Sequence, residues 1–440
     1  GPIAVDRFRW AADAVVLLGV IFTLLMSVEY QESEAMLAGE SHVLVLLATS
    51  GMMLLIAARD LTLVFLGIEL MSISTYVLVA TNRRSARSAE GALKYFLLGA
   101  FSTAFLLYGA ALVYGATGST SFAGIAGALA EGGLAHPLLK PGLALLVVGF
   151  GFKVAAAPFH MWAPDAYEGA PTPITSFMAA TIKAASLAAF MRIFIEAFGA
   201  ALGEWHFALW WLAAITMVVG NVVALAQKSL KRMLAYSSIA HAGYLLIAIV
   251  VGVGAGPTTG ITGSGALLFY LFAYTLSTMG AFAVVSALGT PGDPQLRIED
   301  LGGLWTVRPG LTLAMSTFML ALLGFPVFGG IGFFAKWYMI QAALRGGAAP
   351  QTRLAVVLVL TSVISAGYYL YVVAVMFMRP RAAEAAEPRK LGRLTGTVLT
   401  VAAALILIFG LAPTQVLRAM NRSALSGALA APAAAVAHTP

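Results

Sequence analysis

Long apolar stretches follow one another along almost the whole chain, and each is about as long as a membrane-spanning helix. A helix needs about 20 predominantly apolar residues to cross the hydrocarbon core of a bilayer. About twelve stretches meet this requirement: 10–29, 41–58, 60–81, 91–116, 138–157, 172–197, 205–226, 232–254, 262–288, 309–324 with its broken continuation 328–346, 352–378 and 394–419. The 440 residues are 60% hydrophobic and 10% charged, whereas soluble domains are about 45–50% apolar and about 25% charged. The sequence therefore predicts an all-α polytopic membrane protein with about twelve transmembrane helices.

Basic residues gather in alternate loops between these stretches. The loops on one side carry Arg83, Arg84, Arg87, Lys228, Lys231, Arg232, Arg297, Arg308, Arg379, Arg381, Arg389, Lys390 and Arg393. The loops on the other side carry Arg59, Lys140, Arg345 and Arg353. Because cytoplasmic loops are enriched in Lys and Arg, we expect the first side to be cytoplasmic and both termini to lie outside. Several acidic residues, Glu34 and Glu40 among them, also fall on the basic side, but acidic residues count little in this rule.

The composition also excludes several functions. The net charge of +7 comes from basic residues in short loops, where they set topology and meet lipid headgroups, so we expect no nucleic-acid partner. The chain has no cysteine, which excludes disulfides, cysteine-ligated iron–sulfur clusters and thiol catalysis within it. No GxGxxG, Walker A, CxxC or nucleophile-elbow motif occurs in a fitting context. We therefore expect this chain to hold no cofactor or metal and to perform no redox chemistry.

The ionisable side chains inside the apolar stretches include Glu69, Lys94, Lys153, Lys183 and Lys336. An ionisable group at membrane depth costs about 3 kcal/mol or more unless it faces a partner or a wet cavity. A chain that keeps several such groups is predicted to move charge. We interpret this chain as a proton- or cation-translocating membrane subunit.

A weak internal repeat surrounds two of these lysines. The segment Gly149–Trp162 reads GFGFKVAAAPFHMW, and Gly324–Trp337 reads GFPVFGGIGFFAKW. Each combines glycines, a proline and one lysine within an apolar stretch. Interrupted helices in corresponding halves of a chain are typical of transporters that are built from repeats and bind their ion near the membrane midplane.

Lys153 precedes Pro158, which cannot donate a hydrogen bond within a helix and should break it there. Freed carbonyls in a membrane are tolerated only beside protein or water, so Lys153 is expected to have a wet neighbourhood. The alternative is a lysine that reaches an interface along its apolar stem. Glu69 is too short to do so and needs a cation or a proton, for which Lys153 is the candidate partner. A purely structural ion pair is the alternative for Glu69.

Three further residues could continue a charge pathway. Lys183 lies among small alanines, which let helices approach and leave room for water; a buried structural pair is the alternative. His241 has Tyr236, Ser237, Ser238 and Tyr244 near it in sequence. Histidine titrates near physiological pH and suits a relay between lysines, although a lone helical histidine is as often a packing residue. Lys336 follows Pro326 closely, while the adjacent Trp337 could instead indicate an interfacial position.

Charged residues near the expected cytoplasmic side have simpler explanations. Glu90 and Lys94 are four residues apart, and a local ion pair accounts for them. His160, Asp165 and Glu168 follow the break at Pro158, but their spacing matches no strong metal signature. They indicate either a proton entrance or ordinary loop packing.

Three long strings resemble the antiporter-like subunits of proton-pumping NADH–quinone oxidoreductase, respiratory complex I. They read KVAAAPFHMWAPDAYEGAPTPITSFMAATIK, LKRMLAYSSIAHAGYLL and GFPVFGGIGFFAKWY. YEGAPTPITSF and EGALKYFLLGAFSTAFLLYG are most similar to the subunit N branch of that family. The resemblance covers nearly the whole chain. It implies fourteen helices with two inverted five-helix repeats, each containing one discontinuous helix.

The resemblance also implies roles and boundaries. The family's ion pair falls on Glu69 and Lys153, its connecting lysine on Lys183, its central histidine on His241 and its exit-side lysine on Lys336. The implied parts are an N-terminal helix in 1–40, repeats in 41–197 and 198–378, and a C-terminal helix and tail in 379–440. The family has two helices before the stretch that comes first here, so a shorter gene or a missing start is expected.

The implied function is proton conduction in the membrane arm of the complex, in a bacterial plasma membrane. NADH, flavin, iron–sulfur clusters and quinone would belong to other subunits, and the partners would be neighbouring membrane-arm subunits, lipid and protons. The alternatives are a subunit of a cation/proton antiporter or of a membrane-bound hydrogenase. A structural scaffold, whose buried charges only set the helix register, is a third reading.

Overall fold

The computed structural model describes residues 1–36, 38–252, 261–289, 296–326, 330–345, 350–381 and 391–425. Within these residues, ten helical segments are long and apolar enough to cross a membrane, judged by length and composition. They are α1 (Arg7–Ser33), α2 (Ala38–Ala57), α3 (Leu61–Val79), α4 (Ala86–Thr117), α8 (Thr172–Phe177) continued through η2 (Met178–Ile182) into α9 (Lys183–Glu196), α10 (Leu202–Leu225), α11 (Leu230–Val251), α12 (Gly263–Leu288), α16 (Thr352–Met378) and α17 (Arg393–Leu411). The prediction of an all-helical polytopic membrane protein is confirmed.

Two further spans are interrupted, as the repeated lysine segments predict. The first consists of α6 (Leu139–Lys153) and α7 (Ala163–Gly169), and the second of α14 (Pro309–Leu323) and α15 (Ile331–Arg345). Together with the ten longer segments, these two interrupted segments account for the twelve apolar stretches of the sequence. Short helices complete it: α5 (Phe122–Ala130), η1 (Gly133–Ala135), η3 (Gly199–Ala201), η4 (Ile298–Leu301), α13 (Leu304–Val307) and α18 (Pro413–Arg422).

The spans form two series of five. The first runs from α2 to α9 and the second from α10 to α16, and the fourth span of each series is the interrupted one. Because five is an odd number, the second series starts at the opposite end of the bundle and is inverted relative to the first. The exact limits of the repeats, 41–197 and 198–378, stay a prediction.

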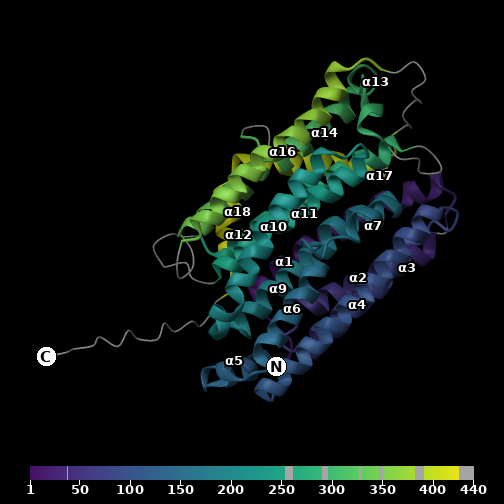
Figure 1. The fold of residues 1–440 in the computed structure, drawn as a ribbon. Coiled ribbons are helices and arrows are strands. Elements are labelled where there is room, and N and C mark those ends of the chain that lie inside the picture. The colour runs from purple at the N-terminus through teal and green to yellow at the C-terminus, as the bar shows by residue number, and fades with distance from the viewer. Residues whose placement is uncertain are drawn as a thin grey trace.

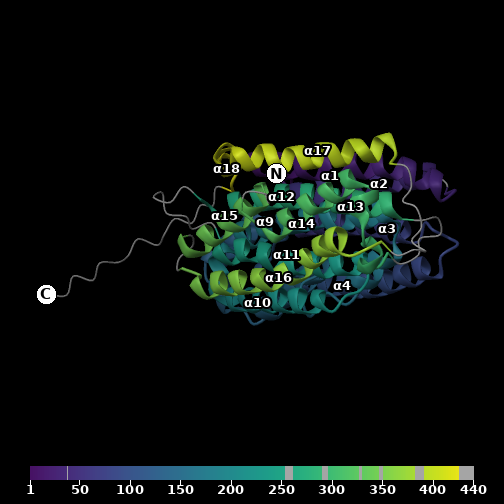
Figure 2. The same cartoon turned by 90° about the horizontal axis from the view of Figure 1, so that it is seen from above.

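The helices pack side by side, and the two ends of the bundle carry different segments (Figure 1). The N-terminus and α5 lie at one end, where Ala4 N donates to Ala57 O at 2.7 Å and Leu61 N donates to Thr120 O at 2.9 Å. The opposite end holds α13. In the view from above, α17 runs along α1 on one face of the bundle (Figure 2). Arg389 and Lys390, two of the basic loop residues, lie outside the described residues.

Burial separates central helices from peripheral ones. The span α8–α9 is wholly buried, and α11 and α12 nearly so, whereas α4, α16 and α17 leave most of their surface open. The open surfaces carry large apolar side chains such as Phe101, Val363 and Ile408, which suit contact with lipid. Lys183 and His241 therefore belong to the protein interior.

A glycine in each of two helix hairpins lets the two helices of that hairpin pack very closely. A Cβ on Gly51 of α2 would lie 2.5 Å from Met71 N of α3, and one on Gly220 of α10 would lie 2.5 Å from Ala240 N of α11. Small residues at crossings allow such approach in membrane proteins. These hairpins are the first two helices of the two series, so both series begin with the same kind of contact.

Candidate functional site

Lys153 is the last residue of α6, at the point where the helix stops. Its side chain is 4% exposed, and its Nζ donates to Ser72 Oγ of α3 at 2.7 Å. The Ser72 hydroxyl itself donates to the carbonyl of Ile68, so its oxygen is free to accept from the lysine. A cation at the C-terminal end of a helix meets the negative end of the helix dipole. The end of α6 therefore gives the lysine a favourable contact that needs no carboxylate.

Glu69 lies one turn before Ser72 on α3 and is half-buried. The direct Glu69–Lys153 ion pair expected from the sequence is not formed within the residues described, because Lys153 Nζ is bound to Ser72 instead. Glu69, the expected partner of Lys153, thus lies on the same face of α3 as the actual contact, which is the neutral hydroxyl of Ser72.

The backbone that leaves Lys153 is irregular but well satisfied. Residues 154–162 are not α-helical, Ala155 has a φ of 56°, and the Ala157–Pro158 peptide is cis. Ala157 N donates to Thr216 Oγ1 of α10 at 3.0 Å, and Trp162 Nε1 donates to Phe152 O at 3.1 Å. Non-helical backbone at membrane depth needs such partners. These hydrogen bonds therefore stabilise the interruption predicted at Pro158, which keeps Lys153 at the end of α6.

Lys183 begins α9, directly after the π-helical turn η2. Its side chain is 2% exposed, and its Nζ donates to both the carbonyl and the hydroxyl of Ser238, at 2.6 Å each. Tyr274 OH of α12 donates to the same hydroxyl at 2.8 Å. Single π turns inside helices occur frequently at functional sites. Lys183 is thus joined to α11 and α12 through one serine.

His241 occupies the centre of a ring of tyrosines. Its Nδ1 lies 3.0 Å from Tyr270 OH of α12, and its Nε2 lies 3.2 Å from Tyr369 OH of α16. Tyr369 OH is also hydrogen-bonded to Ser237. The histidine is 3% exposed. Both ring nitrogens are therefore engaged, as a proton relay requires.

Lys336 lies at the second interruption and repeats the arrangement of Lys153. Its Nζ donates to Leu323 O, the last residue of α14, at 2.8 Å. The side chain is 6% exposed and lies over the Tyr244 ring at 5.0 Å. Gly324 has a φ of 74°, and a Cβ there would lie 2.9 Å from Lys336 Cδ. Glycine is required at this position both for its backbone conformation and for the room it leaves to the lysine.

A small cavity connects His241 with the second interruption. It measures about 10 Å³ and lies between His241, Tyr270, Tyr274 and Ser277 on one side and Ala321 and Gly332 on the other. A space of this size is close to that of one water molecule. The cavity therefore lies between His241 and the two helices that flank the second interruption.

Asp165, in the first turn of α7, joins an ion network. Asp165 pairs with Lys94 at 2.8 Å and with Arg232 at 2.7 Å, and Lys94 also pairs with Glu90 at 2.6 Å. The local Glu90–Lys94 pair is thus present, and it extends to α7 and α11. His160 is half-buried, with its ring 6.4 Å from that of Tyr236. The described residues contain no group of three or more His, Cys, Asp or Glu that could hold a metal.

Several contacts of the buried lysines and of His241 were not predicted from the sequence. Ser72, Tyr270, Tyr274, Tyr369 and the carbonyl of Leu323 come from four different helices, and none is near its lysine or histidine along the chain. Tyr270 and Tyr274 are four residues apart on α12, and this spacing is the signal by which the sequence could have identified them. Tyr236, in contrast, faces His160 and not His241.

Known proteins share this architecture and much of this sequence. Residues 58–365 match the family described as NADH:quinone oxidoreductase/Mrp antiporter, TM. The NADH-quinone oxidoreductase subunit N of Gemmatimonas aurantiaca is 54% identical over 424 residues, which are 96% of this chain and 80% of that protein. A chain of respiratory complex I from Thermus thermophilus with bound Aureothin is 39% identical, with a TM-score of 0.77, over 96% of this chain and 88% of that one. A chain of the Mrp complex from Dietzia sp. has the same fold, with a TM-score of 0.83 at 21% identity, over 96% of this chain and 83% of that one.

Proposed function

Because this chain belongs to the NADH:quinone oxidoreductase/Mrp antiporter family of transmembrane proteins, we propose that it is a membrane-arm subunit of an NADH–quinone oxidoreductase and conducts protons across the membrane. NADH oxidation and quinone reduction then take place in other subunits, which hold the flavin and iron–sulfur clusters. This chain contributes no redox chemistry, and its partners are the neighbouring membrane-arm subunits and the lipid. The location is the plasma membrane of a bacterium, with both termini outside.

One observation carries the proposal. Lys183, Ser238 and Tyr274 form one buried hydrogen-bonded group, and His241, Tyr270 and Tyr369 form a second one beside it. Ser238 and His241 are three residues apart on α11, so they share one face of that helix. For packing alone, apolar side chains would serve better than this series of buried polar and titratable side chains. Proton transfer uses all of them.

The two ends of the pathway are set by the helix interruptions. In the proposed sequence a proton enters at Lys153, passes to Lys183, crosses the His241 group and reaches Lys336. Between Lys153 and Lys183 no direct hydrogen bond exists in the described part of the chain. Proton transfer between these two lysines therefore requires an intervening water molecule or a conformational change. A change in the distance between Glu69 and Lys153 would control this transfer. A nearby carboxylate stabilises the protonated lysine, and its withdrawal releases the proton.

The test is NADH-driven acidification of inverted membrane vesicles with Lys153→Met in the assembled complex. We expect acidification per NADH oxidised to fall at least several-fold, since Met keeps the volume of the side chain and removes its proton. Lys140→Met is the matched control, because Lys140 lies on the same helix but is exposed and pairs with Glu204 at 3.0 Å. Unchanged pumping by the Lys153→Met complex, at equal assembly and redox rate, would make this lysine structural and support the scaffold reading.

A second candidate function is cation/proton antiport, favoured by the shared fold of the Mrp chain. It predicts that transport follows a sodium or potassium gradient and ignores NADH. Replacing both cations by choline in the same vesicles separates the two functions. NADH-driven acidification that persists in choline supports the oxidoreductase. Acidification that appears only with a cation gradient supports the antiporter.

A further inference from the structure

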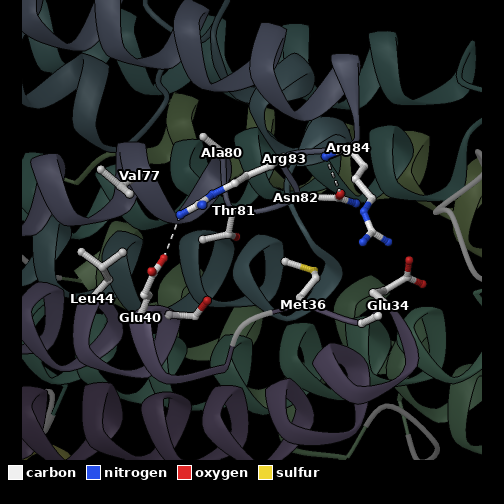
Figure 3. A pocket seen from close by; sticks show the side chains of 12 residues that line it. Glu34, Met36, Glu40, Leu44, Val77, Ala80, Thr81, Asn82, Arg83 and Arg84 are labelled. Atoms are coloured by element: carbon white, nitrogen blue, oxygen red, sulfur yellow. Dashed lines mark hydrogen bonds and ion pairs between the residues drawn. The ribbon is translucent and has the colours of Figure 1, made fainter.

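The ammonium groups of Lys153 and Lys336 lack the partner that a cation at the surface has. Arg83 and Glu40 show the usual arrangement at one end of the bundle, where they form an exposed ion pair at 2.9 Å (Figure 3). The two lysines are only 4% and 6% exposed, and each donates a hydrogen bond to a neutral oxygen. Within the described residues neither forms an ion pair. Because a buried charge is costly without compensation, the aromatic rings beside each lysine become important.

Lys336 lies over the ring of Tyr244. Its Nζ is 5.0 Å from the ring centroid, and Tyr244 is 1% exposed. The face of an aromatic ring attracts an ammonium ion within about 6 Å, and the attraction is stronger where water is excluded. A neutral amine has no charge for the ring to attract. The Tyr244 ring therefore interacts differently with the two protonation states of the lysine.

A buried amide holds the Tyr244 ring in this position. Asn221 of α10 is 0% exposed, and its Nδ2 donates to Tyr244 OH at 2.8 Å and to the carbonyl of Met217 at 2.7 Å. Tyr368 OH of α16 donates to Asn221 Oδ1 at 2.9 Å. Both donors of the amide and its oxygen are thus engaged. Asn221 belongs to no step of the proposed proton pathway, yet it fixes the orientation of the ring beneath Lys336.

Lys153 has aromatic neighbours of the same kind. Its Nζ is 5.9 Å from the ring centroid of Tyr76 on α3 and 5.7 Å from that of Phe152. Tyr76 is 7% exposed, and its hydroxyl end packs so closely against Gly99 of α4 that a Cβ there would have no room. On another side, its ring meets the ring of Tyr95 at 4.6 Å in a T-shaped contact. Tight packing therefore holds this ring beside the lysine.

The two tyrosines occupy corresponding places in the two series of spans. Tyr76 and Tyr244 lie on α3 and α11, the second span of each series, and the two lysines lie on the fourth span, which is the interrupted one. Tyr76 is five residues beyond Met71, where α2 approaches α3, and Tyr244 is four residues beyond Ala240, where α10 approaches α11. The recurrence of this contact in both series indicates that each ring and its lysine act together.

We propose that Tyr76 and Tyr244 bind the ammonium groups of Lys153 and Lys336 through the faces of their rings, and that Asn221 positions Tyr244 for this contact. The inference rests on the proposed function, because it assigns a binding partner to the first and last lysines of the proton pathway. When a lysine gives up its proton, its attraction to the ring is lost, and the next proton restores it. The rings therefore link the protonation of each lysine to its position.

Fluorinated phenylalanines test this proposal, because fluorine weakens the attraction of a ring face for a cation while the ring keeps nearly the same shape. Phenylalanine with increasing numbers of fluorine atoms replaces Tyr76 or Tyr244 in the assembled complex, and acidification per NADH oxidised is measured in inverted vesicles. We expect acidification to fall stepwise with fluorine content, by about threefold or more for the most fluorinated ring. The same series at Tyr108, which is 61% exposed on α4, is the control and should pump like the native chain.

Two ordinary variants separate the ring from its hydroxyl and from its support. Tyr76→Phe should pump nearly like the native chain, because the Tyr76 hydroxyl has no hydrogen-bond partner among the described residues. Asn221→Leu releases the Tyr244 ring and should pump less, and fluorination at Tyr244 should then add little further loss.

Pumping that does not depend on fluorine content at either tyrosine would overturn the proposal, as would a loss at Tyr244 that follows only from removal of its hydroxyl. Either result would leave the proposed function intact if the native complex pumps. A native complex without NADH-driven acidification would contradict the proposed function, and this inference with it.

Discussion

Each of the three lysines of the proposed pathway donates its hydrogen bond to an uncharged oxygen. Lys153 uses a serine hydroxyl, Lys183 a serine hydroxyl and carbonyl, and Lys336 the carbonyl that ends α14. Within the described residues none of the three forms an ion pair. A lysine held by a carboxylate must break a strong attraction to give up its proton, whereas one held by dipoles does not. At the scale of single residues, this arrangement suits a group that is protonated and deprotonated in turn.

The hydroxyl of Tyr369 joins His241 to Ser237, and its removal tests the relay. Tyr369→Phe keeps the ring and loses only the hydroxyl contacts. Because general acid–base groups typically contribute about 10²–10⁴-fold to rate, we expect proton pumping in inverted vesicles to fall about tenfold or more. NADH-driven pumping at matched complex content is the measurement.

The control for this prediction lies two residues away. Tyr371 is 38% exposed and contacts Arg379 through its ring, 5.4 Å from the guanidinium, and Phe preserves that contact. Tyr371→Phe should therefore pump like the native chain. If Tyr369→Phe pumped equally well, the histidine group would be packing and the pathway would have to bypass it.

At the scale of elements, the interrupted helices place each terminal lysine beside a helix end. Lys153 is itself the last residue of α6, while Lys336 belongs to α15 and reaches back to the last carbonyl of α14. The negative end of a helix dipole is a favourable place for a cation. Both lysines therefore lie at the C-terminal end of a helix, although Lys153 belongs to that helix and Lys336 to the helix after the interruption. This difference explains why Lys153 precedes its proline and Lys336 follows its own.

The hairpin of α10 and α11 depends on a missing side chain. A Cβ on Gly220 would lie 2.5 Å from Ala240 N, a backbone atom that cannot yield, and Ala240 is next to His241. Gly220→Ala should force the helices apart and cost about 1–3 kcal/mol, as other overpacked substitutions do. A lower thermal midpoint of the purified complex, with weaker pumping, is the expected result.

The same helix offers a matched control. A Cβ on Gly203 meets nothing within 4 Å, so Gly203→Ala should be neutral or slightly stabilising, because alanine is the better helix former. Equal thermal midpoints for the two alanine variants would show that the α10–α11 crossing can relax, contrary to this account.

At the scale of the whole molecule, an ion network ties the N-terminal segment to the bundle. Arg192 of α9 is 0% exposed, binds both carboxylate oxygens of Asp6 at 2.7 and 2.8 Å, and pairs with Glu196 at 2.8 Å. Arg59 pairs with Glu196 at 2.8 Å and extends the network to the start of α3. Breaking a buried pair by removing one partner costs about 3–5 kcal/mol, so this network holds three parts of one end together.

Removing the buried arginine should destabilise the protein in a pH-dependent way. Burial alone would raise the pKa of Asp6, but hydrogen bonds from Arg192 and from the backbone of Arg9 lower it below its ordinary value. A lowered carboxyl pKa contributes stability that is present above about pH 4 and is lost as the pH falls further. Arg192→Leu should therefore lower the thermal midpoint strongly at pH 7, and the difference from the native chain should shrink below about pH 4.

Thermal unfolding of the detergent-solubilised complex across this pH range is the measurement. Arg7→Leu, an exposed arginine on α1, is the comparison and should leave the midpoint unchanged at every pH. A difference between Arg192→Leu and the native chain that stayed constant with pH would assign the effect to packing and not to the Asp6 pair.

The sequence by itself determined the class of the fold and the residues that matter. Twelve apolar stretches admit only a membrane bundle, because backbone groups in lipid must be satisfied within each helix. Lysines beside prolines and glycines in two of those stretches identified the interruptions in advance, since a buried charge and a helix breaker are both costly and both local. These features depend on composition and short spacing, and for that reason they are legible without a structure.

Tertiary structure alone decided which groups those residues touch. Ser72 in place of Glu69 as the partner of Lys153, the tyrosines around His241 and the carbonyl of Leu323 at Lys336 come from helices far apart in sequence. Helix crossing sets such contacts, through close approach at glycines such as Gly220. Spacing along one chain carries no record of how helices rotate against each other, because many rotations bury the same apolar faces equally well.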